Sequence, residues 1–85
     1  MSLEEQFRSA AERVKTLTTR PSNEQLLDLY AWYKQGTDGD VTGARPGMFD
    51  LKGRAKYDAW AGKKGRSKAD AQQAYVALVD KLLKG

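Results

Sequence analysis

The C-terminal part of the chain carries the most regular pattern of the sequence, with an apolar side chain at every third or fourth position. These positions are Ala71, Ala74, Tyr75, Leu78, Val79 and Leu82. They fall on one side of an α-helix, because a helix repeats every 3.6 residues. Ser67 precedes the run and is a good N-cap residue. The pattern therefore predicts an amphipathic helix that starts after Ser67 and reaches about Leu82.

The first half of the chain predicts two more helices, each opened by a capping box. Ser2 with Glu5 opens the first, whose apolar positions run to about Leu17. Ser22 with Gln25 opens the second, and Gly36 is predicted to end it. Phe7, Val14, Leu17, Leu78, Val79 and Leu82 are predicted to form the core.

A third helix is predicted from about Asp50 to the glycine-rich stretch 62–65. The connection before it, residues 36–50, contains four glycines and Pro46 and has no periodicity. Loops of this length in a small domain are often functional. Because the chain shows no strand pattern and no repeat, the predicted fold is all-α with four helices.

Composition narrows the classes of function. The 85 residues predict one domain, residues 1–85, with a single small core. The chain has no cysteine and no histidine, so the usual zinc ligands and the commonest general base are missing. No apolar run approaches the ~18 residues of a membrane span, and the start lacks a signal-peptide pattern. These features predict a soluble, cytoplasmic protein without a metal site, a cofactor or catalytic residues.

The charge is uneven along the chain. Residues 1–42 carry five Lys/Arg against seven Asp/Glu, whereas residues 43–85 carry ten against four. The second half is therefore strongly basic, which predicts an anionic ligand. Tyr30, Tyr33 and Lys34 stand at helical spacing i, i+3 and i+4 and would project from one face. Two aromatic rings beside a cation suit a ligand that has both a flat ring and a phosphate.

These residues belong to a set of segments in which the chain resembles the acyl-CoA-binding protein family. The segments are 7–17 (FRSAAERVKTL), 29–35 (LYAWYKQ), Gly39-Asp40, 45–48 (RPGM), 50–60 (DLKGRAKYDAW), Lys64-Gly65 and Ser67. The resemblance covers about Phe7 to Leu82 without insertion or deletion. It implies an up-down-down-up four-helix bundle with a shallow ligand bowl. It also implies one-to-one binding of medium- to long-chain fatty acyl-CoA without catalysis.

The same resemblance implies a set of ligand-binding residues. They are Lys15, Tyr30, Tyr33, Lys34, Lys52, Lys56 and Tyr75. In the family, the positions matching Tyr30, Lys34 and Lys56 hold the 3′-phosphate of CoA, and the tyrosine matching Tyr75 also touches the first helix. Leu27 and Met48 are expected to line the groove for the acyl tail. As partners, the resemblance implies fatty acyl-CoA, transient contact with membranes and acyl-CoA-using enzymes, and a monomer.

Four positions depart from the family pattern. Arg54 stands where lysine is usual, Tyr57 where tryptophan is usual, and Gly36 where alanine is typical, while Trp32 occupies a variable site. The charge and the aromatic character are kept at the first two. These departures bear on affinity and chain-length preference more than on the class of ligand.

Three other functions are consistent with single features of the chain. A pI near 9.5 and interleaved basic and aromatic residues are typical of a nucleic-acid-binding module, but no helix-turn-helix, RRM or zinc-binding pattern supports it. A thioesterase would have to use Ser67 or Thr37 without the usual base. A protein-binding module would have no affinity for acyl-CoA.

Overall fold

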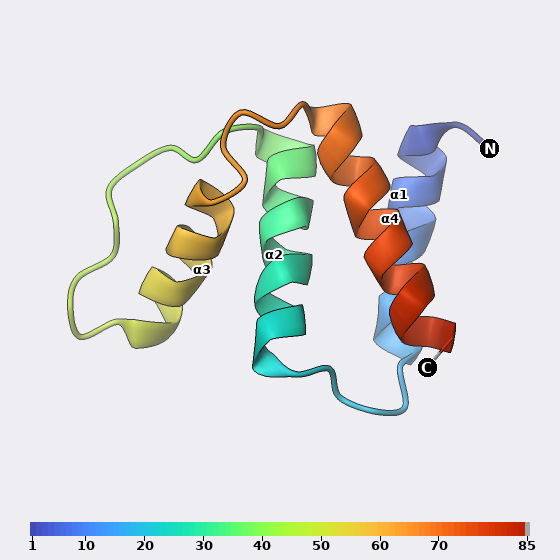
Figure 1. Cartoon of the computed structure of the whole chain (residues 1–85), viewed down its shortest axis with the longest axis horizontal. Helices are drawn as coiled ribbons and strands as arrows, with labels where there is room; N and C mark the ends of the chain where they lie inside the picture. Colours follow the sequence, from blue (N-terminus) through green and yellow to red (C-terminus); the bar gives the residue numbers. More distant parts are fainter. Residues whose placement is uncertain (85) are drawn as a thin grey trace.

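The computed structural model describes residues 1–84 as an all-α bundle, with no β-strand among them. Its helices are α1 (Leu3–Arg13), α2 (Asn23–Asp38), α3 (Leu51–Ala61) and α4 (Lys68–Lys84), with the 3-10 turn η1 (Val14–Thr16) continuing α1. The chain runs in one direction through α1 and α4 and in the opposite direction through α2 and α3 (Figure 1). The arrangement is the predicted up-down-down-up four-helix bundle.

Side-chain caps begin all four helices where the sequence predicts them. The capping side chains are Ser2, Ser22, Asp50 and Ser67, which accept hydrogen bonds from the backbone N–H groups of Glu5, Gln25, Gly53 and Asp70. In the first two helices the box is complete, since the N3 side chain bonds back to the N-cap backbone. Each cap satisfies a backbone donor that has no partner inside the helix.

The predicted end of α2 at Gly36 is wrong. The helix continues to Asp38, and the cap is Gly39, whose φ of 83° suits glycine. Gly36 is buried inside the helix, where a Cβ atom would lie 3.1 Å from both Phe7 Cζ and Gln72 Cγ. The missing side chain at Gly36 thus lets side chains of α1 and α4 approach the backbone of α2 closely.

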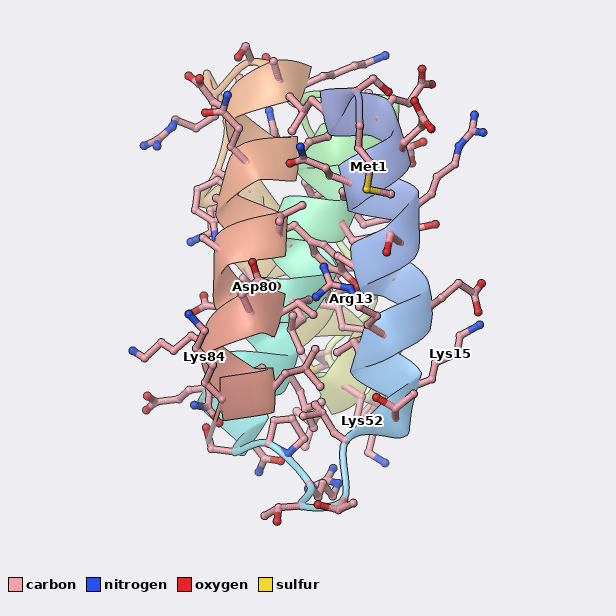
Figure 2. All side chains as sticks on the ribbon, turned by 90° about the vertical axis from the view of Figure 1, so that its right-hand side faces the viewer. Met1, Arg13, Lys15, Lys52, Asp80 and Lys84 are labelled. Carbon is pink, nitrogen blue, oxygen red and sulfur yellow. The ribbon has the colours of Figure 1, made fainter. Side chains whose placement is uncertain are left out.

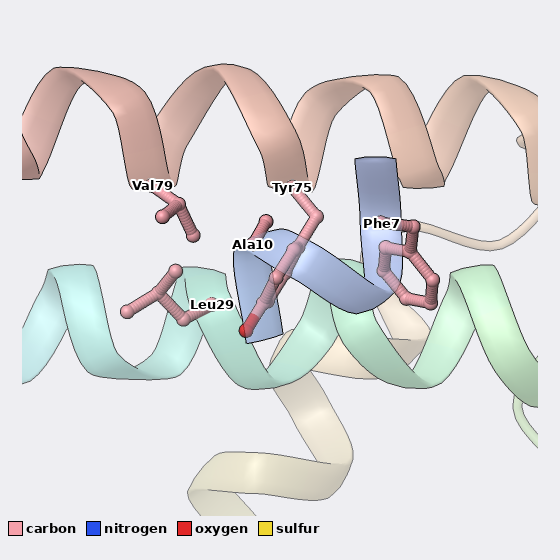
Figure 3. Packing of buried hydrophobic residues seen from close by; sticks show 5 residues of the cluster. All are labelled: Phe7, Ala10, Leu29, Tyr75 and Val79. Carbon is pink, nitrogen blue, oxygen red and sulfur yellow. The ribbon is translucent and has the colours of Figure 1, made fainter. Parts of the chain in front are cut away.

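The core lies between α1, α2 and α4, with α4 packed against both of the others. Its buried members are Phe7, Ala10, Leu29, Tyr75 and Val79 (Figure 3). Of the residues predicted as core, Phe7 and Val79 are buried. Val14, Leu78 and Leu82 are only partly buried and pack against the cluster, and Leu17 is also half-buried. The sequence periodicity therefore identified the helix faces that point to the core, but residues at the margins of these faces are less buried than predicted.

Three aromatic rings join the three core helices. The Phe7 ring of α1 is stacked on Tyr33 of α2 at 5.3 Å between centroids and meets Tyr75 of α4 edge-on at 5.2 Å. The Tyr33 and Tyr75 rings are 5.6 Å apart. Offset-stacked and edge-to-face pairs at these separations are favourable. This aromatic cluster, Phe7–Tyr33–Tyr75, fixes the mutual positions of two tyrosines predicted to bind a ligand.

An ion pair near the surface joins α1 to α4. Arg13 Nη1 lies 2.8 Å from Asp80 Oδ1, and Figure 2 shows the two side chains between the helices. Both side chains are almost half exposed, at 42% and 45%. Exposed pairs contribute little stability. The apolar core therefore accounts for most of the packing of α1 on α4.

The long loop between α2 and α3 is tied to α3 by side chains of that helix. Trp60 Nε1 donates to the Gly39 carbonyl at 2.8 Å, and the Tyr57 hydroxyl donates to the Gly43 carbonyl at 2.9 Å. Asp58 accepts two hydrogen bonds from the Arg45 guanidinium, at 2.9 and 2.7 Å. Planar two-bond pairs of this kind are strong and geometrically specific. The loop is thus held in place by hydrogen bonds, although it has no helix or strand of its own.

A buried amide joins the end of α2 to the turn before α4. Gln35 is completely buried, and its Nε2 donates to Asp40 Oδ1 at 2.9 Å and to the Arg66 carbonyl at 2.8 Å. Asp40 Oδ1 also accepts from the Gly65 N–H at 2.9 Å. The hydrogen bond from the Gly65 N–H is the main cause that holds the pKa of the Asp40 carboxyl below its usual value, and the hydrogen bond from the Gln35 amide adds to this effect. Asp40 therefore has a structural role in both chain reversals that flank α3.

None of the helices among residues 1–84 combines the length and the apolar character needed to cross a bilayer.

Val79→Ala should destabilise the bundle by about 1–3 kcal/mol, because Val79 is fully buried and its truncation leaves a cavity. Urea unfolding followed by circular dichroism measures the change. Val76→Ala is the matched control, since it deletes the same atoms from the same helix at a partly exposed position. Equal losses for the two variants would contradict this account of the core.

Candidate ligand-binding site

Two adjoining cavities open on one side of the bundle. The first, of about 630 Å³, lies between the segment 17–21, α2 and Tyr75 of α4. The second, of about 490 Å³, lies between α2 and α3. Arg20, Leu26 and Tyr30 line both cavities, so the two adjoin. We call these two cavities together the bowl.

All three tyrosines predicted to bind a ligand line the bowl. Tyr30, Tyr33 and Tyr75 line the first cavity, and Tyr30 also faces the second. Tyr30 and Tyr33 stand one turn apart on α2, which places both rings on one face. Tyr75 reaches the bowl from α4, and Figure 3 shows its side chain extending from that helix toward α2. Burial, and to a lesser degree Tyr33, raises the pKa of the Tyr75 hydroxyl, which therefore stays neutral at physiological pH.

Three of the four predicted lysines also line the bowl. Lys15 lies at the rim of the first cavity, 3.5 Å from Glu12 Oε2, and its side chain extends outward in Figure 2. Lys52 and Lys56 line the second cavity from the first two turns of α3. Lys56 Nζ stands 5.4 Å from the centroid of the Tyr30 ring, within the range of a cation–π contact. The bowl thus has positive charge at both ends and aromatic rings between them.

Lys34 differs from the other lysines because it lines neither cavity. Its ammonium forms an ion pair with Asp38 on the next turn of α2 and stands 4.9 Å from the centroid of the Trp60 ring. The hydrogen bond that Lys34 donates to Asp38, with smaller charge effects from Asp38, Tyr30 and Tyr33, raises the pKa of Lys34. The structure therefore gathers six of the seven predicted residues around the bowl and leaves Lys34 beside it.

The apolar lining of the bowl comes from helices on both of its sides. Leu26 and Leu29 face the first cavity, while Leu27, Leu51 and Ala55 face the second. Leu27 was expected to line the groove for an acyl tail, and it does line the second cavity. Met48 lines neither cavity and is 68% exposed on the loop before α3.

The segment 17–21 is the main part of the bowl that sequence reasoning missed. Arg20 lines both cavities, and Leu17 and Pro21 line the first. In the sequence this segment shows only the signals of a helix break. Its role depends on how α1 and α2 pack, and no local pattern encodes that position.

The positions that depart from the family pattern have identifiable contacts. Tyr57 anchors the long loop through its hydroxyl, whereas Arg54 Nε is buried and has no hydrogen-bond partner among residues 1–84. Trp32 lies under two cations of the turn between α3 and α4. Lys63 Nζ is 4.3 Å and Arg66 Cζ 5.4 Å from its ring centroid. The aromatic face of Trp32 thus gives both cations a fixed contact.

A third hollow, also of about 630 Å³, lies between the segment 16–21 and the end of α4. It shares the segment 17–21 with the first cavity, but it contains none of the predicted site residues and no aromatic side chain. Among residues 1–84 there is also no group of three acidic or other metal-ligating side chains. The bowl is therefore the candidate site.

Comparison with known proteins agrees with this geometry. A family model described as "Acyl CoA binding protein" matches residues 4–79. The chain belongs to the acyl-CoA-binding protein family. Acyl-CoA-binding protein homolog 1 of Caenorhabditis elegans is 64% identical over 77 residues, which cover 91% of this chain and 90% of the worm protein. An acyl-CoA-binding protein of Brassica napus is 53% identical over 83 residues, which cover 98% and 90% of the two chains.

Solved structures of the family share the fold. The crystal structure of Oryza sativa acyl-CoA-binding protein 2 aligns with a TM-score of 0.94 at 48% identity, over 98% of this chain and 92% of the rice chain. The predicted family and the predicted four-helix fold are therefore confirmed. The matches give no support to a nucleic-acid-binding or protein-binding module.

Proposed function

We propose that this protein binds medium- to long-chain fatty acyl-CoA thioesters one to one, as a single domain formed by residues 1–85. The observation that carries the proposal is the bowl, which combines an apolar lining with tyrosines and lysines at its edges. Membership of the acyl-CoA-binding protein family supports the same ligand. No metal or cofactor is needed for such binding.

The head of the ligand suits the polar side of the bowl. An acyl-CoA carries roughly four negative charges on its phosphates. Lys52 and Lys56 offer charge-assisted hydrogen bonds to phosphate, and the Tyr30 hydroxyl can donate to the same group. Tyr33 is exposed enough for its ring to stack on adenine, a contact worth roughly 1–3 kcal/mol per base in nucleic-acid complexes. Lys15 on η1 and Lys34 in the last turns of α2 would add further positive charge.

The acyl tail suits the apolar walls. Each methylene taken out of water contributes about 0.8 kcal/mol, so two more methylenes should tighten binding roughly tenfold until the groove is filled. Leu26, Leu27 and Ala55 provide such walls on α2 and α3. Tail burial is then the largest single contribution to affinity.

The protein would act as a carrier and not as an enzyme. The chain has neither cysteine nor histidine, and the two hydroxyls considered as nucleophiles are engaged in the fold. Ser67 Oγ caps α4 by accepting from the Asp70 N–H, and Thr37 Oγ1 donates to the Tyr33 carbonyl at 2.9 Å. A cytoplasmic location is part of the proposal and fits a cysteine-free chain. So is a monomeric state, with acyl-CoA-using enzymes as transient partners.

The tip of the long loop favours contact with a membrane surface during loading. Phe49 is 95% exposed and Leu51 74% exposed, and Met48 lies beside them. Met48 and Phe49 lie within the turn closed by the hydrogen bond from the Asp50 N–H to the Gly47 carbonyl, at 3.0 Å, and Leu51 follows this turn. Grouped exposed apolar side chains mark interaction sites. Lys52 follows directly, so the tip matches an anionic bilayer in both polarity and charge. Leu51 and Lys52 also line the bowl, which places the tip beside the tail groove.

Calorimetric titration with palmitoyl-CoA below its micelle concentration tests the proposed ligand. We expect tight one-to-one binding of the thioester and much weaker binding of CoA alone and palmitate alone, because each fragment makes only half of the contacts. No heat from palmitoyl-CoA would contradict the proposed function.

Tyr30→Phe should weaken palmitoyl-CoA binding roughly ten- to hundredfold, the effect of losing a hydrogen bond to a charged group, while thermal stability stays nearly constant. The same titration and a thermal melt provide the two readings. Tyr57→Phe is the matched control, because its hydroxyl bonds to Gly43 outside the bowl. It should lower stability and leave affinity within about twofold. If Tyr30→Phe melts the fold and spares binding, the tyrosine is a packing residue.

Phe49→Gln should reduce binding to vesicles of phosphatidylcholine and phosphatidylserine roughly tenfold, since a large apolar side chain is lost from the contact. Co-sedimentation with the vesicles measures this, and calorimetry should give an unchanged affinity for palmitoyl-CoA in solution. Leu83→Gln, an exposed apolar position on α4, should bind vesicles like the unmodified chain. Equal vesicle binding by both variants would exclude the tip as the membrane contact.

A further inference from the structure

Lys34 is held by a carboxylate of its own helix, unlike the lysines on α3. Asp38 lies one turn further along α2, and its Oδ2 pairs with Lys34 Nζ. The structure gives no such partner to Lys52 or Lys56 within residues 1–84. Lys15 is also paired, with Glu12 at 3.5 Å, but both of those side chains are more than 70% exposed. The Lys34 side chain is only 29% exposed, so its pair is better shielded from water.

The position of Asp38 is electrostatically unusual. It is the last residue of α2, where the helix dipole favours a positive charge and disfavours a carboxylate. The hydrogen bond from Lys34 is the main cause that lowers the pKa of the Asp38 carboxyl, which is therefore ionised at neutral pH. On its other side Lys34 faces the ring of Trp60 at 4.9 Å. The ammonium is thus held between a carboxylate and an aromatic ring at the edge of the bowl.

We propose that Asp38 is an internal counter-ion that lowers the affinity of this site for phosphate. Lys34 has to give up or share its carboxylate partner before it can bind the phosphate of a ligand. Asp38 also repels that phosphate directly. The inference rests on the proposed function and makes Asp38 an affinity-determining residue that does not itself touch the ligand. It lets the protein retain the ligand through its tail while releasing the head readily.

Asp38→Asn tests the proposal with little disturbance, since the side chains are nearly isosteric and have similar helix propensity. We expect the dissociation constant for palmitoyl-CoA to fall about three- to tenfold, from the lost ion pair and the lost repulsion together. In 0.5 M NaCl the gain should shrink, because salt screens charges near the surface. Asp28→Asn is the control: it also removes one negative charge from α2, but from a residue paired with Lys63. Its affinity should change less than twofold.

A double variant separates a local counter-ion from a general charge effect. In a Lys34→Met background, Asp38→Asn should tighten binding clearly less than in the unmodified chain, because only the direct repulsion of the phosphate is then relieved. An equal gain with and without Lys34 would overturn the proposal, and so would an unchanged or weaker affinity in Asp38→Asn alone. Thermal melts of each variant identify any that fail to fold, and Asp38→Ala then replaces Asp38→Asn. If the unmodified chain itself fails to bind palmitoyl-CoA, the proposed function is wrong. If it binds tightly and Asp38→Asn leaves the affinity unchanged, only the role of Asp38 is wrong.

Discussion

The aromatic cluster of Phe7, Tyr33 and Tyr75 is the contact on which the rest of the structure depends. It joins α1, α2 and α4 through ring separations of 5.2 to 5.6 Å, and two of its three members also line the bowl. Packing and recognition therefore share the same side chains. Gly36 belongs to this arrangement, because a Cβ atom there would lie only 3.1 Å from the Phe7 ring. The bowl is shaped by the core and is not an addition to it.

The attachment of α3 follows a different physical principle. This helix packs mainly against α2, and hydrogen bonds tie it to the long loop. Asp40 and the buried Gln35 hold the chain reversals on both sides of it. A buried amide that lost such partners would cost about 1–3 kcal/mol, so these bonds specify one position for the loop. Polar contacts thus fix the wall of the bowl that carries Lys52 and Lys56.

The sequence predicts the helices well because their starts are local chemistry. Ser2 and Ser22 cap their helices through residues only three positions away, and the apolar faces follow from periodicity. Gly36 was misread as a stop because its reason lies in Phe7 and Gln72, which are distant in sequence. The segment 17–21 was missed for the same reason. The tyrosines and lysines around the bowl were identified through family resemblance, and spacing alone placed only Tyr30, Tyr33 and Lys34 on one face. The partnership of Lys34 with Asp38 is local, at i and i+4, and could have been read from the sequence.

The two parts of the bundle also respond differently to a bound ligand. The first cavity is lined by η1, α2 and α4, beside the core shared by α1, α2 and α4. The second lies between α2 and α3, and α3 contributes no residue to the core cluster. A ligand that spans both cavities adds contacts between α2 and α3, an interface that lies outside the core cluster. A ligand that binds only the folded state stabilises that state. Because the added contacts involve α3, we expect ligand binding to slow amide hydrogen exchange most strongly in α3. Binding then completes the attachment of α3 to the bundle, and the rigid three-helix core provides the fixed surface against which it closes.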